Sequence, residues 1–107
     1  PGTMADVPIE QVAEVEHLLA FVRGSGCTVH RNGSDHSARE AVKHIEKKYD
    51  YFRDDISSSE EFIEYSASMS TLSGNDYQVS CSGSKTESTR DWLLKELQRF
   101  RIKRNKK

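Results

Sequence analysis

Residues 27–44 read CTVHRNGSDHSAREAVKH, and the prediction of the fold rests mainly on this stretch. Its first part alternates, so that Cys27 and Val29 share one face while polar residues occupy the other. This period of two predicts a half-buried strand. Asn32-Gly33 follows directly, and both residue types tolerate the positive φ of a tight turn.

The part after the turn predicts an amphipathic helix. Ser37 and Glu40 have the spacing of a capping box, in which each side chain accepts a hydrogen bond from the other residue's backbone amide. The predicted apolar stripe of this helix consists of Ala38, Ala41, Val42, Ile45 and Tyr49. Residues 50–55 are polar and aromatic, and we interpret them as a loop.

Three more helices and a second strand are predicted outside this stretch. A first helix over 9–22 ends at Gly24 and Gly26, and its apolar stripe is Ile9, Val12, Val15, Leu19 and Val22. A third helix, capped by Ser57 with Glu60 or by Ser58 with Glu61, carries Phe62, Ile63 and Ala67. The second strand has Tyr77, Val79 and Cys81 on one face. The last helix, from Ser88 or Thr89 to about Lys103, carries Trp92, Leu93, Leu97 and Phe100.

These elements predict an α+β fold in which about four helices pack around a short two-strand antiparallel ribbon. The chain of 107 residues has the length of one domain. We expect residues 1–4 to be a remnant of the cloning vector, 5–103 to form the domain and 104–107 to form a basic tail. No apolar stretch approaches the roughly 18 residues of a membrane span, so the chain is not expected to be transmembrane.

The two cysteines are predicted to form a disulfide. Cys27 and Cys81 stand at the edges of the two predicted strands, 54 positions apart. If these strands pair, the two Cβ atoms can reach the roughly 3.5–4.5 Å that a disulfide requires. Such a bridge indicates an oxidising compartment such as the periplasm. The alternative is a pair of unconnected buried thiols in a cytosolic protein.

The charge is distributed unevenly. Six of the last nine residues are basic, and without them 10 basic residues stand against 17 acidic ones. An acidic body is a poor match for nucleic acid and favours a basic protein partner. We expect the basic end to be a solvated end of the last helix.

Residues across 31–79 also carry a family resemblance. The matching residues are Arg31, Asn32, Gly33, His36, Glu40, Ala41, His44, Lys48, Ile56, Glu60, Phe62, Ile63, Ala67, Ser68, Ser70, Gly74, Tyr77 and Val79. In these positions the chain resembles the YfeK-like family of small, uncharacterised bacterial exported proteins. The resemblance implies a precursor with a signal peptide and a periplasmic or envelope location. It implies no activity, cofactor or partner, and it does not require the cysteine pair.

Two binding sites are conceivable in this stretch. His36, Glu40 and His44 recur at four-residue steps, a spacing that can hold zinc or copper, with His30 or Asp35 as a further ligand. Structural roles in capping and in a half-buried hydrogen bond explain these residues better, so we expect no metal and no cofactor. Arg31 beside Asn32-Gly33 and the following helix is a candidate anion site. The alternative is that Arg31 pairs with a local acid.

Neither catalysis nor an interface has a strong signature. Cys27 with His30 or His36 is a candidate catalytic nucleophile. A structural role explains a cysteine at the edge of a strand better, and we do not expect an enzyme. Tyr51, Phe52 and Tyr65 are aromatics in polar surroundings, typical of a protein interface or of the lid of a small core.

The sequence therefore predicts an exported domain that binds a protein or envelope component as an inhibitor, immunity-type or accessory protein. Possible interaction residues are Arg31, Asn32, His36, Tyr51 and Phe52. The alternative function is binding of a small anion or a metal by residues 31–44. The oligomeric state is left open.

Overall fold

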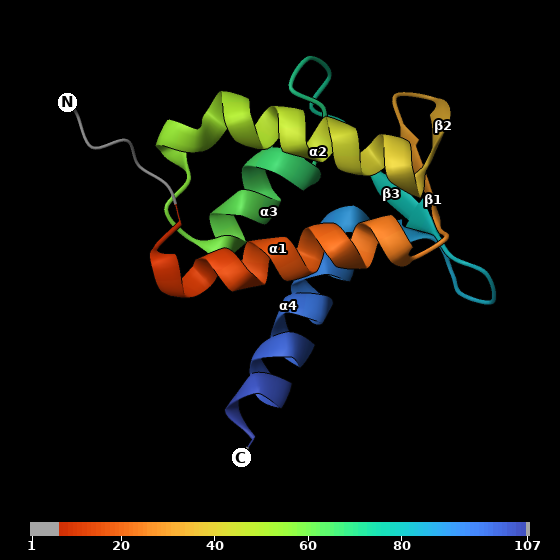
Figure 1. Ribbon diagram of the computed structural model, residues 1–107. Coiled ribbons are helices and arrows are strands. Elements are labelled where there is room, and N and C mark those ends of the chain that lie inside the picture. Colours follow the sequence, from red (N-terminus) through yellow and green to blue (C-terminus); the bar gives the residue numbers. More distant parts are fainter. Residues whose placement is uncertain (1–6, 107) are drawn as a thin grey trace.

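The computed structural model describes residues 7–106, which form four α-helices and four strands. In chain order the elements are α1 (Ile9–Gly24), β1 (Thr28–Arg31), β2 (Ser34–Ser37), α2 (Ala38–Phe52), a 3₁₀ turn (Arg53–Asp55), α3 (Ser59–Ala67), β3 (Gln78–Ser80), β4 (Glu87–Ser88) and α4 (Thr89–Asn105). Figure 1 shows α1 and α2 running in opposite directions above α4, with α3 between them and the strands gathered at one end.

The predicted α+β class is confirmed, and the two-strand ribbon is the centre of a larger sheet. The strand order is β2-β1-β3-β4, and every neighbouring pair is antiparallel. The sequence indicated only β1 and β3, because these are the strands with a buried face. The strand β2 reads SDHS with no buried residue, and β4 has two residues, so neither shows an apolar alternation.

The hairpin of β1 and β2 is built as the sequence predicts. Arg31 pairs with Ser34 across the turn, and the turn residues Asn32 and Gly33 have φ of 52° and 79°. Positive φ at both central residues defines the turn type that matches the twist of a two-residue hairpin. The strand β2 then ends at Ser37, which caps α2 in the predicted capping box with Glu40.

The disulfide between Cys27 and Cys81 is confirmed, with a Cα–Cα distance of 4.4 Å. Cys27 directly precedes β1 and Cys81 directly follows β3. Because Thr28 pairs with Ser80, the antiparallel register places the two cysteines opposite each other. The bridge therefore fixes the two central strands at one end of their ladder.

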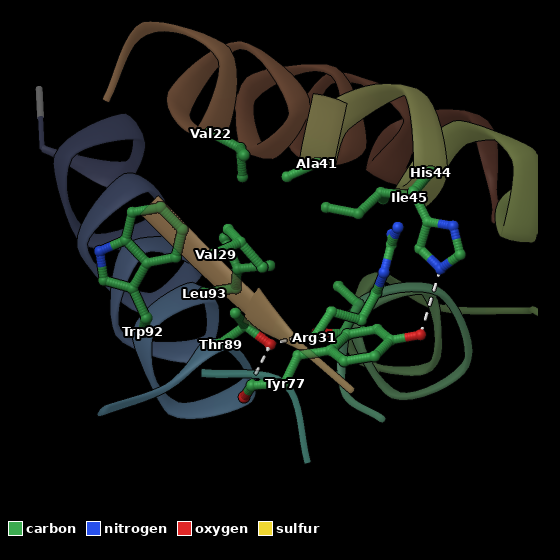
Figure 2. Close-up of a pocket in the computed structure, with 11 residues that line it drawn as sticks. Val22, Val29, Arg31, Ala41, His44, Ile45, Tyr77, Thr89, Trp92 and Leu93 are labelled. Carbon is green, nitrogen blue, oxygen red and sulfur yellow. Dashed lines mark hydrogen bonds between the residues drawn. The ribbon is translucent and has the colours of Figure 1, made fainter. Parts of the chain in front are cut away.

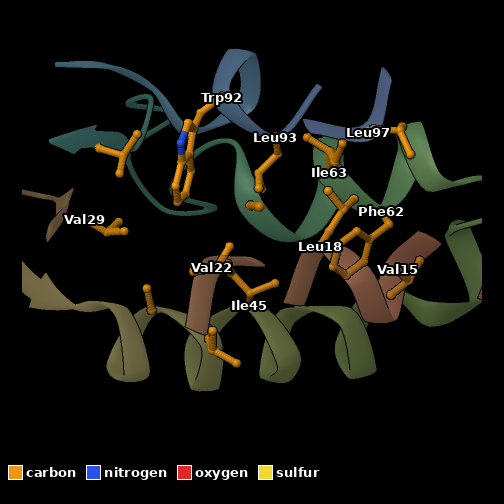
Figure 3. Close-up of a cluster of buried hydrophobic side chains, with 14 of the residues drawn as sticks. Val15, Leu18, Val22, Val29, Ile45, Phe62, Ile63, Trp92, Leu93 and Leu97 are labelled. Carbon is orange, nitrogen blue, oxygen red and sulfur yellow. The ribbon is translucent and has the colours of Figure 1, made fainter. Parts of the chain in front are cut away.

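A single apolar core lies between the helices and one face of the sheet (Figure 3). Phe62 and Ile63 of α3, Leu18 of α1 and Leu93 of α4 are each 1% exposed. The helix α2 contributes its predicted stripe, in which Ala38, Ala41, Val42 and Ile45 are all buried. All four helices therefore share one core, and α3 lies near its centre.

The predicted apolar face of α1 is only partly right. Val15 and Val22 are buried, but Ile9 is 87% exposed and Val12 is 38% exposed. The buried face instead includes Leu18 and the carboxylate of Glu14, which is 1% exposed. The prediction failed because a buried acidic residue interrupts the apolar periodicity. Of the two glycines predicted to end α1, Gly24 is helical and Gly26 adopts the left-handed conformation.

Glu14 holds the end of α4 against α1. Arg101 donates to its two carboxylate oxygens at 2.8 and 2.9 Å, Arg104 donates at 2.6 Å and Ser59 donates at 2.7 Å. The hydrogen bond from Arg101 lowers the pKa of Glu14 to about 2. The last helix thus continues to Asn105, and Arg101 and Arg104 are not the solvated end that we expected.

Two boundaries differ from the predictions. The helix α2 continues through Asp50, Tyr51 and Phe52, which we expected in a loop, and the 3₁₀ turn follows it. At α3 the cap is Ser58, whose hydroxyl accepts from the amide of Glu61. Of the two caps that the sequence left open, Ser58 is therefore the one that forms, but the carboxylate of Glu61 accepts from the amide of Ser57 at 2.8 Å and not from that of Ser58.

The disulfide is expected to supply a large share of the stability. On the chain-entropy argument, a bridge that closes a loop of this size contributes about 4 kcal/mol to the free energy of unfolding. A double variant, Cys27→Ser with Cys81→Ser, should therefore unfold at a much lower urea concentration than the oxidised protein. Added reductant should leave the double variant unchanged. A loss below about 1 kcal/mol would contradict this role of the bridge.

Candidate functional site

Three charged side chains are deeply buried within residues 7–106: Glu14, Lys48 and Glu96. Glu14 has the arginine partners described above. Glu96 accepts from Arg99 at 2.7 and 2.9 Å and lies 2.5 Å from Nε2 of His17. Both acids thus follow the rule that a buried charge is paired. Lys48 does not follow it.

Lys48 is a buried cation without an acidic partner. It belongs to the last part of α2 and is only 8% exposed. Its Nζ donates to the carbonyl oxygen of Met69 at 2.6 Å and to the phenol oxygen of Tyr77 at 3.4 Å. Within the described residues no carboxylate lies at ion-pair distance from it. Burial lowers the pKa of Lys48, and the charge of Arg31 lowers it further.

Tyr77 connects Lys48 to His44. Its phenol oxygen lies 3.1 Å from Nε2 of His44, which precedes Lys48 by one helical turn. Because Lys48 donates to the phenol oxygen, the phenol proton is free to point to His44, and a neutral Nε2 accepts it. Burial first, and then the charges of Arg31 and Lys48, lower the pKa of His44 to about 4. The imidazole is therefore neutral at pH 7.

Arg31 completes a group of cationic and polar side chains at the end of β1. In Figure 2 its side chain extends beside the ring of Tyr77 toward His44. It is partly exposed. No hydrogen bond or ion pair within residues 7–106 occupies its guanidinium, so the local acid that we considered as its partner is not there. The hairpin turn next to it and the cap of α2 place Arg31 and Lys48 in one neighbourhood.

These residues line a hollow of about 300 Å³ on the surface. Its lining consists of Arg31, Asn32, His44, Lys48, Ser70, Thr71, Leu72 and Tyr77. On the inner side of Arg31 and Tyr77 lies the apolar pocket of Figure 2, whose volume of about 10 Å³ admits at most one water molecule. A ligand would therefore occupy the outer hollow.

A second hollow of about 370 Å³ shares part of this lining. It is bounded by Lys48, Phe52, Glu64, Tyr65, Met69, Ser70, Thr71 and Gly74. Lys48, Ser70 and Thr71 line both hollows, which are therefore neighbours, and we call the two together the Lys48 groove. One hollow has the cationic Arg31, and the other has the rings of Phe52 and Tyr65 together with Glu64, which pairs with Arg90 at 3.4 Å. The loop between α3 and β3 borders it and is tied to the hairpin by a hydrogen bond from Asn32 to Ser70 at 3.2 Å.

The candidate metal ligands are not brought together. His36 belongs to β2 and not to a helix, so the stripe of four-residue steps does not form. Its Nδ1 lies 3.7 Å from Glu40, whereas His44 faces Tyr77. Within the described part of the chain no three His, Cys, Asp or Glu side chains are grouped as a metal site. Cys27 is in the disulfide and is no nucleophile.

A row of three side chains crosses the sheet beside the hairpin. His30 lies 2.6 Å from Asp35 through Nδ1 and 2.7 Å from Ser80 through Nε2. This is the connectivity of a catalytic triad, but a triad keeps its carboxylate buried and adds oxyanion donors. Asp35 is 71% exposed, and the hydroxyl of Ser80 is also bonded to Thr86 at 2.7 Å. We interpret the row as cross-strand hydrogen bonds that connect β2, β1 and β3.

The aromatic candidates divide between surface and groove. Tyr51 is 81% exposed on the last turn of α2. Phe52 is partly buried and contacts Tyr65 of α3, with 5.6 Å between ring centroids. Of the predicted interaction residues, Arg31, Asn32 and Phe52 therefore line the Lys48 groove, while His36 and Tyr51 do not.

Sequence reasoning missed Lys48 and Tyr77 as site residues. The signal for Lys48 was its position, since it lies seven residues after Ala41 and three after Ile45, on the buried stripe of α2. A lysine at a core position needs a polar partner. Its partners Met69 and Tyr77 come from later parts of the chain, so the sequence pattern did not reveal the cluster.

The chain matches a known protein family over most of its length. The family described as "Family of unknown function (DUF5329)" matches residues 9–101, which contain α1 to α3, the four strands and α4 as far as Arg101. The chain belongs to this family. It is also 34% identical over 74 residues to "Uncharacterized protein YfeK" of Salmonella typhimurium, which confirms the YfeK-like resemblance.

That match covers 68% of this chain, and it spans 62% of the length of the Salmonella protein. No solved structure is recognisably similar to the chain. None of the helices within residues 7–106 is long and apolar enough to cross a membrane.

The neutral state of His44 predicts a pH dependence. The pKa of His44 is about 4 in the folded protein and 6.5 in the unfolded chain. Between these two pH values the unfolded chain therefore binds a proton at His44 that the folded protein does not bind. The free energy of unfolding should therefore fall as the pH falls through this window. In His44→Gln, whose amide oxygen still accepts from Tyr77, the fall should be smaller by about 2 kcal/mol. Urea titrations across the window measure this, and a ring-proton NMR midpoint near 6.5 would contradict it.

Proposed function

We propose that this protein is a binding domain whose partner, a protein or envelope component, presents an anionic group to Arg31 and Lys48. The observation that carries this proposal is the buried ammonium of Lys48, which contacts the carbonyl of Met69 and the phenol and ring of Tyr77 but has no carboxylate partner among residues 7–106. Burying a lone cation is unfavourable, and a ligand anion would remove that cost. The arrangement thus supports the anion-binding alternative, and it also supplies a contact for a larger partner.

The electrostatics of the groove support an anion over a cation. Arg31 offers a planar fork of donors that suits a carboxylate or phosphate. The phenol of Tyr77, the amide of Asn32 and the hydroxyls of Ser70 and Thr71 provide further polar contacts in the same hollow. We expected a basic partner from the acidic body, but the charges around His44 are positive, because Arg31 and Lys48 both lower its pKa. The local field governs recognition at this site.

We further propose that the protein acts without catalysis in an oxidising compartment such as the periplasm. The disulfide supports this location, because such bridges persist where thiols are not kept reduced. Within the described residues, the row of Asp35, His30 and Ser80 is the one that resembles a catalytic triad. Its carboxylate, Asp35, is exposed, and this favours binding over hydrolysis. Metal binding receives no support from the positions of His36, Glu40 and His44.

An NMR titration with sodium acetate and with sodium phosphate, at constant ionic strength, tests the anion site. Saturable shifts are expected at the backbone amides of Arg31, Asn32, Lys48 and Ser70. The variant Arg31→Gln should weaken binding about tenfold, because a charge-assisted contact is lost. Arg39→Gln, an equal charge change on the exposed side of α2, should have no effect. Shifts that rise linearly, or that survive Arg31→Gln unchanged, would overturn the proposal.

A further inference from the structure

We propose that the Lys48 groove binds the C-terminal residue of a peptide, with the carboxylate at Arg31 and an apolar side chain at Phe52 and Tyr65. This inference rests on the proposed function and names the chemistry of its ligand. It follows from the chemistry of the two neighbouring hollows, which have Arg31 in one, Phe52 and Tyr65 in the other, and Lys48, Ser70 and Thr71 in both. The carboxylate of Glu64 beside the two rings is already paired with Arg90 at 3.4 Å.

The hollow of Arg31 suits one carboxylate. Arg31 provides one guanidinium fork, which binds a planar carboxylate through two parallel hydrogen bonds. Lys48 already donates to Met69 and Tyr77, so one of its three ammonium protons remains for the ligand. A carboxylate has two coplanar oxygens, so the single guanidinium fork satisfies both of them, and we take a carboxylate as the anion of the ligand.

The hollow of Phe52 and Tyr65 suits an apolar side chain. Phe52 packs against Tyr65, which is 38% exposed, and Met69 lies on the same hollow. Aromatic rings and the thioether of methionine provide an adaptable apolar surface. A large side chain that covers these groups would remove their exposed carbon atoms from water. We therefore expect the last residue of the peptide to be aromatic or a large aliphatic residue.

The polar residues that the two hollows share favour a peptide over an acyl chain. The hydroxyl of Ser70 accepts from Asn32 and from the amide of Ser73, both at 3.2 Å, which leaves its own proton free to donate. The exposed Thr71 lies beside it. A hydrocarbon chain would leave these groups without partners, whereas a peptide carbonyl accepts from them. The hollows also lie near the lower limit of small-ligand pockets, which fits one or two residues.

Calorimetry with acetyl-Ser-Gly-Ser-Gly-Phe as the free acid and as the C-terminal amide tests this assignment. The acid is expected to bind about tenfold more tightly than the amide, because the amide lacks the charge. Replacing the last residue of the free-acid peptide by glycine should also weaken its binding about tenfold. Arg31→Gln should abolish the preference for the free acid over the amide. Phe52→Ala should abolish the preference for phenylalanine over glycine as the last residue of the peptide. Ile9→Ala, which removes an exposed apolar side chain at the start of α1 and away from both hollows, should change neither.

The outcomes separate this inference from the proposed function. Equal binding of acid and amide, with acetate shifts still present at Arg31, would overturn the peptide assignment and leave the anion site in place. Tighter binding of monomeric laurate than of the peptide, with the same dependence on Phe52, would overturn it in favour of an amphipathic lipid. Absence of both peptide and acetate binding would overturn both proposals.

Discussion

The structure depends on the pairing of β1 with a strand on each side. Its partner β2 follows through the Asn32-Gly33 turn and ends at the residue that caps α2. Its other partner, β3, follows Tyr77 directly and is fixed by the disulfide. One strand therefore sets the positions of Arg31, of the start of α2 and of the phenol of Tyr77. The groove is a consequence of this register, because a slip by one residue would exchange the two faces of β1.

The buried charges distinguish structural from functional polar groups. Glu14 receives three side-chain donors and fastens α4 to α1, while Glu96 plays a similar part with His17 and Arg99. In both cases a cationic partner compensates the buried carboxylate, so no ligand is needed to explain its burial. Lys48 has a carbonyl and a phenol as partners and lies beside a second unpaired cation. Such an arrangement costs stability, so a role in binding explains it better than a role in folding.

The sequence predicts the local features of this fold well. The Asn32-Gly33 turn, the Ser37 capping box, the stripe of α2 and the disulfide all depend on neighbouring residues or on strand edges, and all are confirmed. The failures have non-local causes. Glu14 is buried because Arg101 and Arg104 reach it from the far end of the chain, and α1 therefore turns a different face to the core. The groove depends on Tyr77 and Met69 meeting Lys48, which no spacing within α2 indicates.

The side-chain pKa of Lys48, followed by NMR at its Nζ with and without acetate, tests the central claim most directly. A buried cation without an acidic partner should have a pKa below the usual 10.5, and a bound carboxylate should raise it. A pKa at or above 10.5 in the free protein would show that Lys48 is already paired or solvated. A lowered pKa that acetate leaves unchanged would show that the groove does not bring an anion to it.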